Sequence, residues 1–355
     1  MERKRELFPD VLRIAATCAV VMLHTVTGTT DIHYTPGVEV RWPYYNLIVD
    51  YSSWAVPIFL IMSGYFFLDP KREMPLKKLY LKHCLRIVLA IYLFGVPFSL
   101  IEQIGGYHGF IWAMVPQALW CATRNLTWAH MWYLYAILIL YAITPLLRLI
   151  LPKIPKAVVL GLMGVLFTVT CVLPFINSVF RIALWNWTWM PLMYLAYYIC
   201  GYYFAVSKRE AKPWHVKLEI ALIALLAVLE ILIRVVLERG NGPGYSYPLT
   251  VIISLLIFAL GKDLGALGKR KRQTADAEDK PGKGAKVIAF FADLCFGIYL
   301  VHPVFLNFFY KFIDVSLYDY PFVPGLIVFY LLTLAGAVVL SFLLRLIPPM
   351  KKYVL

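Results

Sequence analysis

The sequence predicts an all-α polytopic membrane protein with about ten transmembrane helices and both termini on the cytoplasmic side. Of the 355 residues, 61% are hydrophobic and only 15% are charged, and the mean hydropathy is +0.72. This composition excludes a soluble globular protein. Apolar runs of about 20 residues recur along the chain, which is the length a helix needs to cross the hydrocarbon. Basic residues alternate between scarce and abundant in successive gaps between the runs, as in multi-pass proteins.

Each long apolar run is expected to form one helix, because only helices and closed barrels satisfy their own backbone hydrogen bonds in lipid. The run from Phe110 to Cys121 is too short to span and is expected to lie at the membrane interface. No polar block is large enough to form a separate domain, so residues 1–355 are interpreted as a single membrane domain. The predicted spans are 11–28, 48–68, 84–104, 131–150, 157–175, 189–206, 217–237, 247–261, 287–311 and 322–347.

The orientation follows from lysine and arginine, which concentrate in the short loops on the cytoplasmic side. Of the 34 basic residues, 24 lie at the two termini and in every second gap, and five lie in the intervening gaps. The net charge of +14 is therefore explained by topology, and no nucleic acid is expected as a partner. The longest basic gap, residues 262–286, is expected to be a flexible cytoplasmic loop. A contact with anionic lipid or nucleotide is the alternative interpretation.

Two ionisable residues lie within the first predicted span. Arg13 and His24 are eleven residues apart, which places them on one helix face about 16 Å apart along the axis. Alone, Arg13 could reach toward the membrane surface and His24 could make an interhelical hydrogen bond. Together they indicate a path leading inward from the cytoplasmic end. They also favour a retained first span over a cleaved signal peptide.

Two further candidates lie in other spans. His302 is predicted at a depth similar to that of His24, although before Pro303 it could instead cap a helix kink. Arg86 enters the third span from the cytoplasmic side, where it could bind phosphate by charge and bidentate hydrogen bonds. Positive-inside anchoring is the competing explanation for Arg86.

Several other polar or reactive residues are assigned structural roles. Glu230 and Arg234 are four residues apart and are interpreted as a mutually neutralising pair. His130 is interpreted as an interfacial residue. The six cysteines have no CxxC spacing and no histidine partners at metal-ligand spacing. They are interpreted as small apolar fillers, and no metal is expected.

Four segments resemble the acyltransferase 3 family of integral membrane acyltransferases. RIAATCAVVMLH, from Arg13 to His24, is similar to that family's signature of an arginine, ten residues and a histidine. The other segments occur in the family's order and together extend over nearly the whole chain. They are VPIFLIMSGYFFL at 56–68, HMWYLYAILILYAITPLL at 130–147 and FGIYLVHPVFL at 296–306.

The resemblance implies an O-acyltransferase in a membrane-domain-only form. Known members move an acyl group, usually acetyl, from cytoplasmic acyl-CoA to extracytoplasmic carbohydrates or cell-wall components. The expected donor substrate is acetyl-CoA or another acyl-CoA, and the expected acceptor is a hydroxyl of an extracytoplasmic carbohydrate or cell-envelope glycan. The expected location is the cytoplasmic membrane of a bacterium, with the lipid bilayer as the third partner.

The resemblance also implies roles for individual residues. Arg13 and His24 correspond to essential family residues, and Arg86 corresponds to the second arginine of an Arg-x-x-Arg element. His83 replaces the first arginine, and the neighbouring Lys82 could supply the missing charge. His24 is the expected general base, because the pKa of an imidazole can lie near neutral pH. The predicted catalytic residues are His24, Arg13 and His302, and the predicted donor-binding residues are Arg13, Arg86 and Lys82.

Two other classes of function are compatible with the same residues. An exporter of a polysaccharide or an intermediate could line its pathway with buried Arg and His side chains without any transferase chemistry. A sensor or scaffold is the third class. Turnover of a thioester by the purified protein separates the acyltransferase from both.

Overall fold

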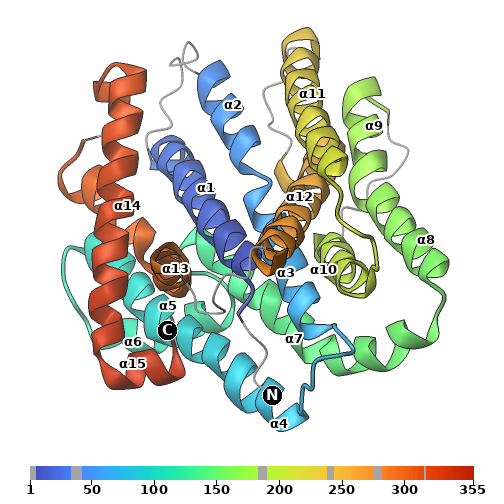
Figure 1. Ribbon diagram of the computed structural model, residues 1–355. Coiled ribbons are helices and arrows are strands. Elements are labelled where there is room, and N and C mark those ends of the chain that lie inside the picture. Colours follow the sequence, from blue (N-terminus) through green and yellow to red (C-terminus); the bar gives the residue numbers. More distant parts are fainter. Residues whose placement is uncertain (1–4, 33–41, 183–189, 238–243, 275–281, 316) are drawn as a thin grey trace. The chain divides into compact units, whose positions relative to one another are not determined.

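The structure is a computed structural model that describes residues 5–32, 42–182, 190–237, 244–274, 282–315 and 317–355. All regular secondary structure in these residues is helical (Figure 1), so the predicted all-α class is confirmed for this part of the chain. The longer helices are α1 (Leu7–Ile32), α2 (Trp42–Ser52), α3 (Ala55–Phe67), α5 (Leu85–Tyr107), α6 (Met114–Thr123), α7 (Trp132–Ile150), α8 (Lys156–Phe167), α9 (Leu173–Phe180), α10 (Met190–Val206), α11 (Pro213–Leu237), α12 (Pro248–Thr274), α13 (Lys283–Asn307) and α14 (Phe322–Leu346). Short helices are α4 (Leu76–Lys78) and α15 (Pro348–Tyr353), and π-helical turns are η2 (Leu79–Cys84), η5 (Thr168–Val172) and η7 (Phe308–Phe312).

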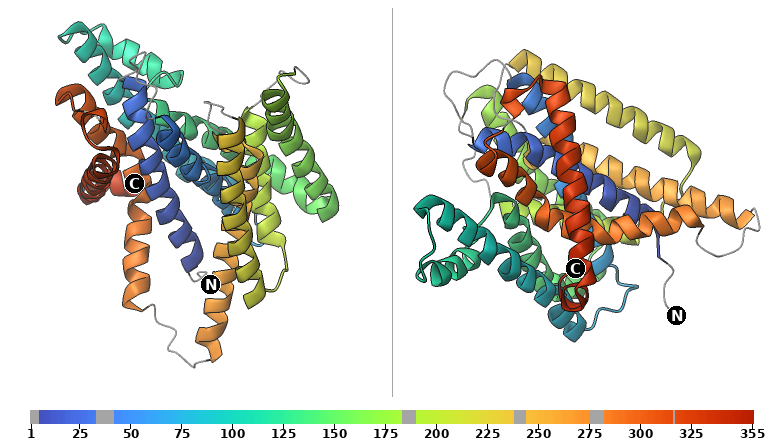
Figure 2. Two further views of the ribbon diagram at one scale, coloured as in Figure 1. Left: turned by 90° about the horizontal axis from the view of Figure 1, so that it is seen from above. Right: turned by 90° about the vertical axis from the view of Figure 1, so that its left-hand side faces the viewer.

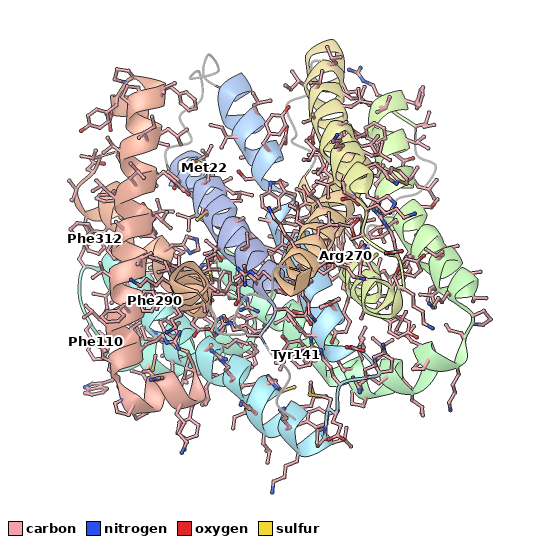
Figure 3. All side chains as sticks on the ribbon, viewed as in Figure 1. Met22, Phe110, Tyr141, Arg270, Phe290 and Phe312 are labelled. Atoms are coloured by element: carbon pink, nitrogen blue, oxygen red, sulfur yellow. The ribbon has the colours of Figure 1, made fainter. Side chains whose placement is uncertain are left out.

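Eight helical segments in the described residues are long and apolar enough to cross a membrane. Large apolar side chains such as Phe290 and Phe312 are exposed (Figure 3), which is the expected state of a surface that faces lipid. The chain is therefore a multi-pass membrane protein. The eight segments are Leu7–Gly28, Leu47–Phe67, Leu76–Gly106, Ala129–Lys153, Lys156–Phe180, Pro248–Arg272, Lys283–Phe312 and Phe322–Leu346.

The remaining two predicted spans also correspond to apolar helices. Helix α10 covers residues 190–206 of the predicted span 189–206 and has only 17 residues, while residue 189 lies outside the described residues. Helix α11 covers 217–237 with 25 residues. The total of ten spans and the cytoplasmic location of both termini stay predictions. The predicted interfacial run from Phe110 to Cys121 overlaps helix α6, and its place at the interface also stays a prediction.

The chain divides into two compact units, each of which is described by itself. The first comprises residues 1–66 and 156–341, and the second comprises residues 67–155 and 342–355. In the first unit α1 packs against α2, α12 and α13, and Figure 2 shows the blue α1 beside the orange α13. In the second unit α5 packs against α6 and α7. The helix pair α1 and α13 carries most of the predicted site.

Helices α3 and α10 meet at two glycines, Gly64 and Gly201. A Cβ atom at Gly64 would lie 1.9 Å from the carbonyl oxygen of Tyr198, and one at Gly201 would lie 2.2 Å from the carbonyl oxygen of Ile61. The two backbones are therefore in direct contact. Small residues permit this approach in membrane helix pairs, where packing rather than the hydrophobic effect drives association.

The structure corrects the predicted loop at residues 262–286. Helix α12 continues through Thr274, and α13 begins at Lys283. Residues 275–281 lie outside the described part of the chain. Most of the basic segment before them consists of Leu, Ala, Lys, Arg and Gln, which favour helix. Lys271 and Arg272 in the last turn also interact favourably with the negative end of the helix dipole.

The predicted second span is likewise not one continuous helix. It consists of α2 and α3, which are separated at Ser53 and Trp54. The Ser53 hydroxyl donates to the carbonyl oxygen of Val49 at 2.7 Å, and the Ser53 amide donates to the carbonyl oxygen of Asp50 at 3.1 Å. These local bonds replace regular helical bonds at the break, as small hydroxyl residues commonly do.

Candidate active site

Arg13 and His24 both lie in the unbroken helix α1. The structure thus confirms the helix on which their predicted spacing depends. Eleven residues of continuous α-helix place the two side chains on one face, about 16 Å apart along the axis. Neither residue is exposed. Helix α1 therefore presents a cation near its N-terminal end and an imidazole in its interior.

His302 of α13 meets His24 of α1 inside the first unit. The two imidazole centroids are 5.2 Å apart, and the ring planes are inclined by 39°. The His302 side chain is fully buried, with 0% of its surface exposed. Depth arguments from sequence place both histidines at one level, and the structure adds their lateral contact. The predicted catalytic histidines are therefore neighbours.

Main-chain bonds of His302 fix the orientation of its ring. Its Nδ1 lies 2.8 Å from the carbonyl oxygen of Tyr299 and 3.1 Å from that of Ile298. A carbonyl can only accept, so Nδ1 carries the hydrogen, and in the neutral ring Nε2 keeps a lone pair. Pro303 has no N–H for the Tyr299 carbonyl, which is its partner four residues back in a regular helix. The Nδ1 hydrogen of His302 supplies the missing donor, as the kink-capping interpretation predicts.

Beyond the two histidines, Tyr310 of the turn η7, which follows α13, contacts α1. Its hydroxyl donates to the carbonyl oxygen of Thr25 at 2.9 Å. Tyr310 is also part of a buried apolar cluster with Val26, Leu306 and Phe329. These contacts link η7 to the turn of α1 that follows His24.

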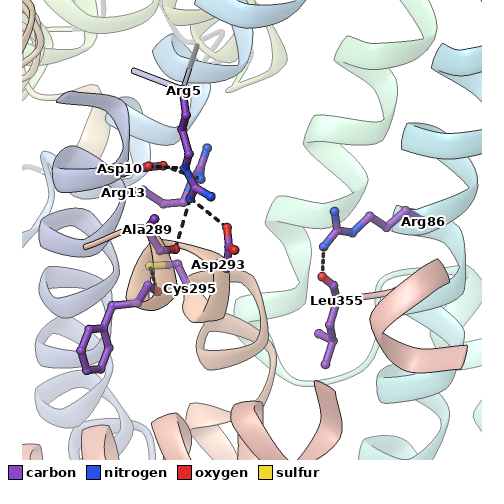
Figure 4. Close-up of polar contacts among 9 residues, drawn as sticks. Arg5, Asp10, Arg13, Arg86, Ala289, Asp293, Cys295 and Leu355 are labelled. Carbon is purple, nitrogen blue, oxygen red and sulfur yellow. Dashed lines mark hydrogen bonds and ion pairs between the residues drawn. The ribbon is translucent and has the colours of Figure 1, made fainter. Parts of the chain in front are cut away.

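Toward the N-terminal end of α1, Arg13 lies in a charged cluster with Arg5, Asp10 and Asp293 (Figure 4). Asp10 Oδ2 accepts from Arg5 Nε at 2.5 Å, and Asp10 Oδ1 lies 3.4 Å from Arg13 Nη1. Arg5 Nη2 also donates to Asp293 Oδ1 at 2.8 Å and to the Ala289 carbonyl at 3.2 Å. The bond to Asp10, and then that to Asp293, raise the pKa of the Arg5 guanidinium.

Sequence reasoning missed the two carboxylates of this cluster. Asp10 precedes Arg13 by three residues, a spacing at which helical side chains meet, so the sequence contained a signal for this pair. Asp293 lies on a different helix, 288 residues from Arg5 along the chain, and no local pattern could connect it with Arg5.

Arg86 and Lys82, predicted to bind the donor together with Arg13, belong to the second unit. Arg86 donates from Nε to the carbonyl oxygen of Val354 at 2.7 Å and from Nη2 to that of Leu355 at 2.5 Å, and Figure 4 shows the latter bond. Lys82 is exposed in the π-helical turn η2. His83 packs edge-on against Phe67, with ring centroids 4.9 Å apart. The proximity of this basic group to Arg13 stays a prediction.

The other polar residues named from the sequence lie as follows. Glu230 Oε1 accepts from the Thr250 hydroxyl at 3.4 Å, whereas the side chain of Arg234 lies outside the described residues. His130 is buried near Phe98, with centroids 5.9 Å apart. In the described residues, no group of three or more His, Cys, Asp or Glu side chains could hold a metal ion.

The geometry defines what the helix pair can do chemically. The neutral imidazole of His302, whose Nε2 has a lone pair, can accept a proton, and it lies against the imidazole of His24. Along the same face of α1, a half-buried guanidinium can bind an anion. Proton transfer at the two histidines, and anion binding at Arg13 about 16 Å from His24 along α1, are therefore available on this helix pair.

The sequence matches a known family over most of its length. The acyltransferase domain of the acyltransferase 3 family matches residues 6–345, a range that includes Arg13, His24, Arg86 and His302. No match was found among curated proteins or solved structures.

Proposed function

The chain belongs to the acyltransferase 3 family, and from that membership we propose that it transfers an acyl group, expected to be acetyl, from cytoplasmic acyl-CoA to a hydroxyl of an extracytoplasmic carbohydrate or cell-envelope glycan. The observation that supports this proposal most is the arrangement of Arg13 and His24 on one face of α1, with His302 against His24. This arrangement has one group for a polyanionic donor and one for proton transfer.

In the proposed reaction the donor phosphates bind near Arg13, and the long arm of coenzyme A extends along α1 toward His24. Arg13 lies near the N-terminal end of α1, which is the cytoplasmic end in the predicted topology. The distance of about 16 Å between the residues separates the charged headgroup from the reacting thioester. Arg86 and Lys82 are proposed as further donor contacts. Phosphate would then share the Arg86 guanidinium with the carbonyls of residues 354 and 355.

His24 is proposed as the general base. As the acceptor oxygen attacks the thioester carbonyl, His24 takes the hydroxyl proton, and a new carbon–oxygen bond forms. The carbon–sulfur bond then breaks, and the imidazolium returns the proton to the leaving sulfur of coenzyme A. A positioned base of this kind typically contributes about 10²- to 10⁴-fold to the rate. The ring of His302 contacts that of His24, and His302 is the alternative base. Its tautomer is set by the bond to the main chain.

The proposed location is the cytoplasmic membrane of a bacterium. Ten spans, cytoplasmic termini and a bacterial cytoplasmic membrane give acyl-CoA access to the N-terminal end of α1. They also place His24 and His302 in the outer half of the bilayer, within reach of an acceptor from outside.

The decisive experiment measures thioester turnover by the protein purified in lipid nanodiscs. Acetyl-CoA labelled in the acetyl group is supplied with and without carbohydrate acceptors, and free thiol and acylated carbohydrate are both quantified. We expect thiol release that depends on an acceptor hydroxyl, together with transfer of the label. An exporter without transferase chemistry would release no thiol. Mass spectrometry of surface glycans from cells with and without the protein then identifies the acylated sugar.

A further inference from the structure

Asp10 lies between two arginines and binds them unequally. Its contact with Arg5 is short, at 2.5 Å, whereas its contact with Arg13 is 3.4 Å. The Asp10 side chain is 6% exposed, that of Arg13 is 32% exposed and that of Arg5 is 46% exposed. Asp10 is thus a buried carboxylate with one firm partner and one loose partner, and the loose partner is the cation that carries the proposed donor site.

We propose that Asp10 is an exchangeable counter-ion of Arg13. The ion pair between the two residues opens when the Arg13 guanidinium binds a donor phosphate, and it forms again when coenzyme A leaves. This inference rests on the proposed function. It assigns Asp10 as a positioning residue that acts through Arg13 and sets the affinity for the coenzyme A part of donor and product.

The exchange costs little free energy because the ion pair between Arg5 and Asp10 remains in place. Removing the partner of a buried charge is strongly destabilising when nothing else compensates that charge. Here the Arg5 guanidinium remains at hydrogen-bond distance, so Asp10 stays paired when Arg13 turns to a phosphate. Among the described residues, Asp10 is the only carboxylate in ion-pair contact with Arg13.

Helix α13 keeps Arg5 in place during the exchange. Arg5 Nη2 donates to Asp293 and to the main-chain carbonyl of Ala289. Arg5 therefore joins the start of α1 to α13 independently of Arg13. The cluster contains two arginines and two aspartates, so Arg13 is neutralised before any ligand binds, and an incoming phosphate must compete with Asp10.

This competition predicts that removing the Asp10 charge increases the affinity for coenzyme A, whereas structural damage would decrease it. Without the Asp10 charge, no carboxylate of the described residues is in ion-pair contact with Arg13 and the phosphate meets one negative charge fewer, so coenzyme A should bind more tightly. Partly exposed ion pairs of this kind are weak, so the expected change is about two- to five-fold. Tighter product binding should also strengthen inhibition of turnover by free coenzyme A.

The experiment compares Asp10→Asn with Asp293→Asn in the full-length protein in nanodiscs. Both substitutions remove a carboxylate charge from Arg5, but only Asp10 contacts Arg13, so Asp293→Asn is the matched control. Binding of free coenzyme A is measured by calorimetry, and thermal unfolding is measured in parallel. We expect the dissociation constant to fall about two- to five-fold in Asp10→Asn and to be unchanged in Asp293→Asn.

Unchanged or weaker coenzyme A binding in a folded Asp10→Asn protein would overturn the proposal, and so would an equal gain in Asp293→Asn. If Asp10→Asn does not fold, Asp10→Glu provides the test, because it keeps the charge on a longer side chain that reaches both arginines. Asp10→Glu should bind coenzyme A more weakly than the wild type, and equal or tighter binding would contradict the exchange. A wild-type protein that binds no coenzyme A would overturn the proposed function itself.

Discussion

The Nδ1 atom of His302 donates to the main-chain carbonyl of Tyr299, 2.8 Å away. The following residue, Pro303, creates the need for this bond, because proline cannot donate to the carbonyl four residues before it. A histidine directly before a proline therefore supplies the hydrogen-bond donor that the helix lacks at Pro303, and the same bond sets the tautomer of His302. Kink capping and catalysis, the two interpretations of His302 from sequence, are compatible. The capping bond fixes the orientation and tautomer that the ring would need as a base.

The substitution Pro303→Ala tests this relationship. Alanine at this position would supply an N–H to the Tyr299 carbonyl, so His302 would lose its role as the donor and its ring would be less constrained. We expect the helix to be unchanged or slightly more stable and the acyl-transfer rate to fall several-fold. Transfer assays combined with thermal unfolding measure both effects. A fully active variant would mean that the tautomer of His302 does not matter for turnover.

The close approach of α3 and α10 predicts a large effect of a single methyl group. Gly64→Ala would place a Cβ 1.9 Å from the Tyr198 carbonyl oxygen, so the helices must move apart. Overpacking of a well-packed core typically costs about 1–3 kcal/mol, and a backbone neighbour leaves little room to relax. Gly161→Ala in α8 is the control, because its Cβ would meet nothing within 4 Å. Thermal unfolding in one detergent should separate the two variants clearly.

The topology prediction depends on the asymmetry of 24 basic residues against five. Reporter fusions after Leu355, and reporter insertions between residues 275 and 281, should both report a cytoplasmic location. An extracytoplasmic signal from either position would contradict ten spans with both termini inside.

Two variants test the role of Arg86, and both lose the hydrogen bonds between Arg86 and the carbonyls of residues 354 and 355. Arg86→Ala removes the proposed phosphate contact and also the bonds to the carbonyls of Val354 and Leu355. Deleting residues 354 and 355 removes those bonds together with two buried apolar side chains, and it keeps the cation. Hydrogen bonds to charged groups contribute about 1.5–3 kcal/mol, so Arg86→Ala should raise the KM for the donor about ten-fold or more. The deletion should leave this KM unchanged. Equal effects of the two changes would show that Arg86 acts by holding the C-terminal segment.

The sequence predicted those features that depend on local periodicity. Apolar run length located the eight candidate spans, and helical spacing placed Arg13 and His24 on one face of α1. The break between α2 and α3 and the helical continuation to Thr274 were not predicted, because they depend on local hydrogen bonding and propensity within segments classified only by hydropathy.

Contacts between distant segments were beyond the reach of one sequence. His24 and His302 could be matched in depth but not in lateral position, which depends on how α1 packs on α13. Arg86 illustrates the same limit. A basic residue at a span end has the same pattern whether it binds phosphate, lipid or protein, and here its described partners are carbonyls 268 and 269 residues away in sequence.

The most direct test of the mechanism is His24→Gln. Glutamine keeps hydrogen-bonding capacity but cannot serve as a base near neutral pH, so the substitution separates catalysis from a structural hydrogen bond between helices. We expect acyl transfer to fall by about 10²- to 10⁴-fold, the usual contribution of a positioned general base. Coenzyme A binding and thermal unfolding should stay close to the wild type, because Arg13 lies about 16 Å away along α1. Single-turnover transfer with saturating donor measures the chemical step. Near-normal transfer by His24→Gln would assign His24 a structural role, and His302, whose Nε2 keeps a lone pair in the neutral ring, would then be the next base to test by the same substitution.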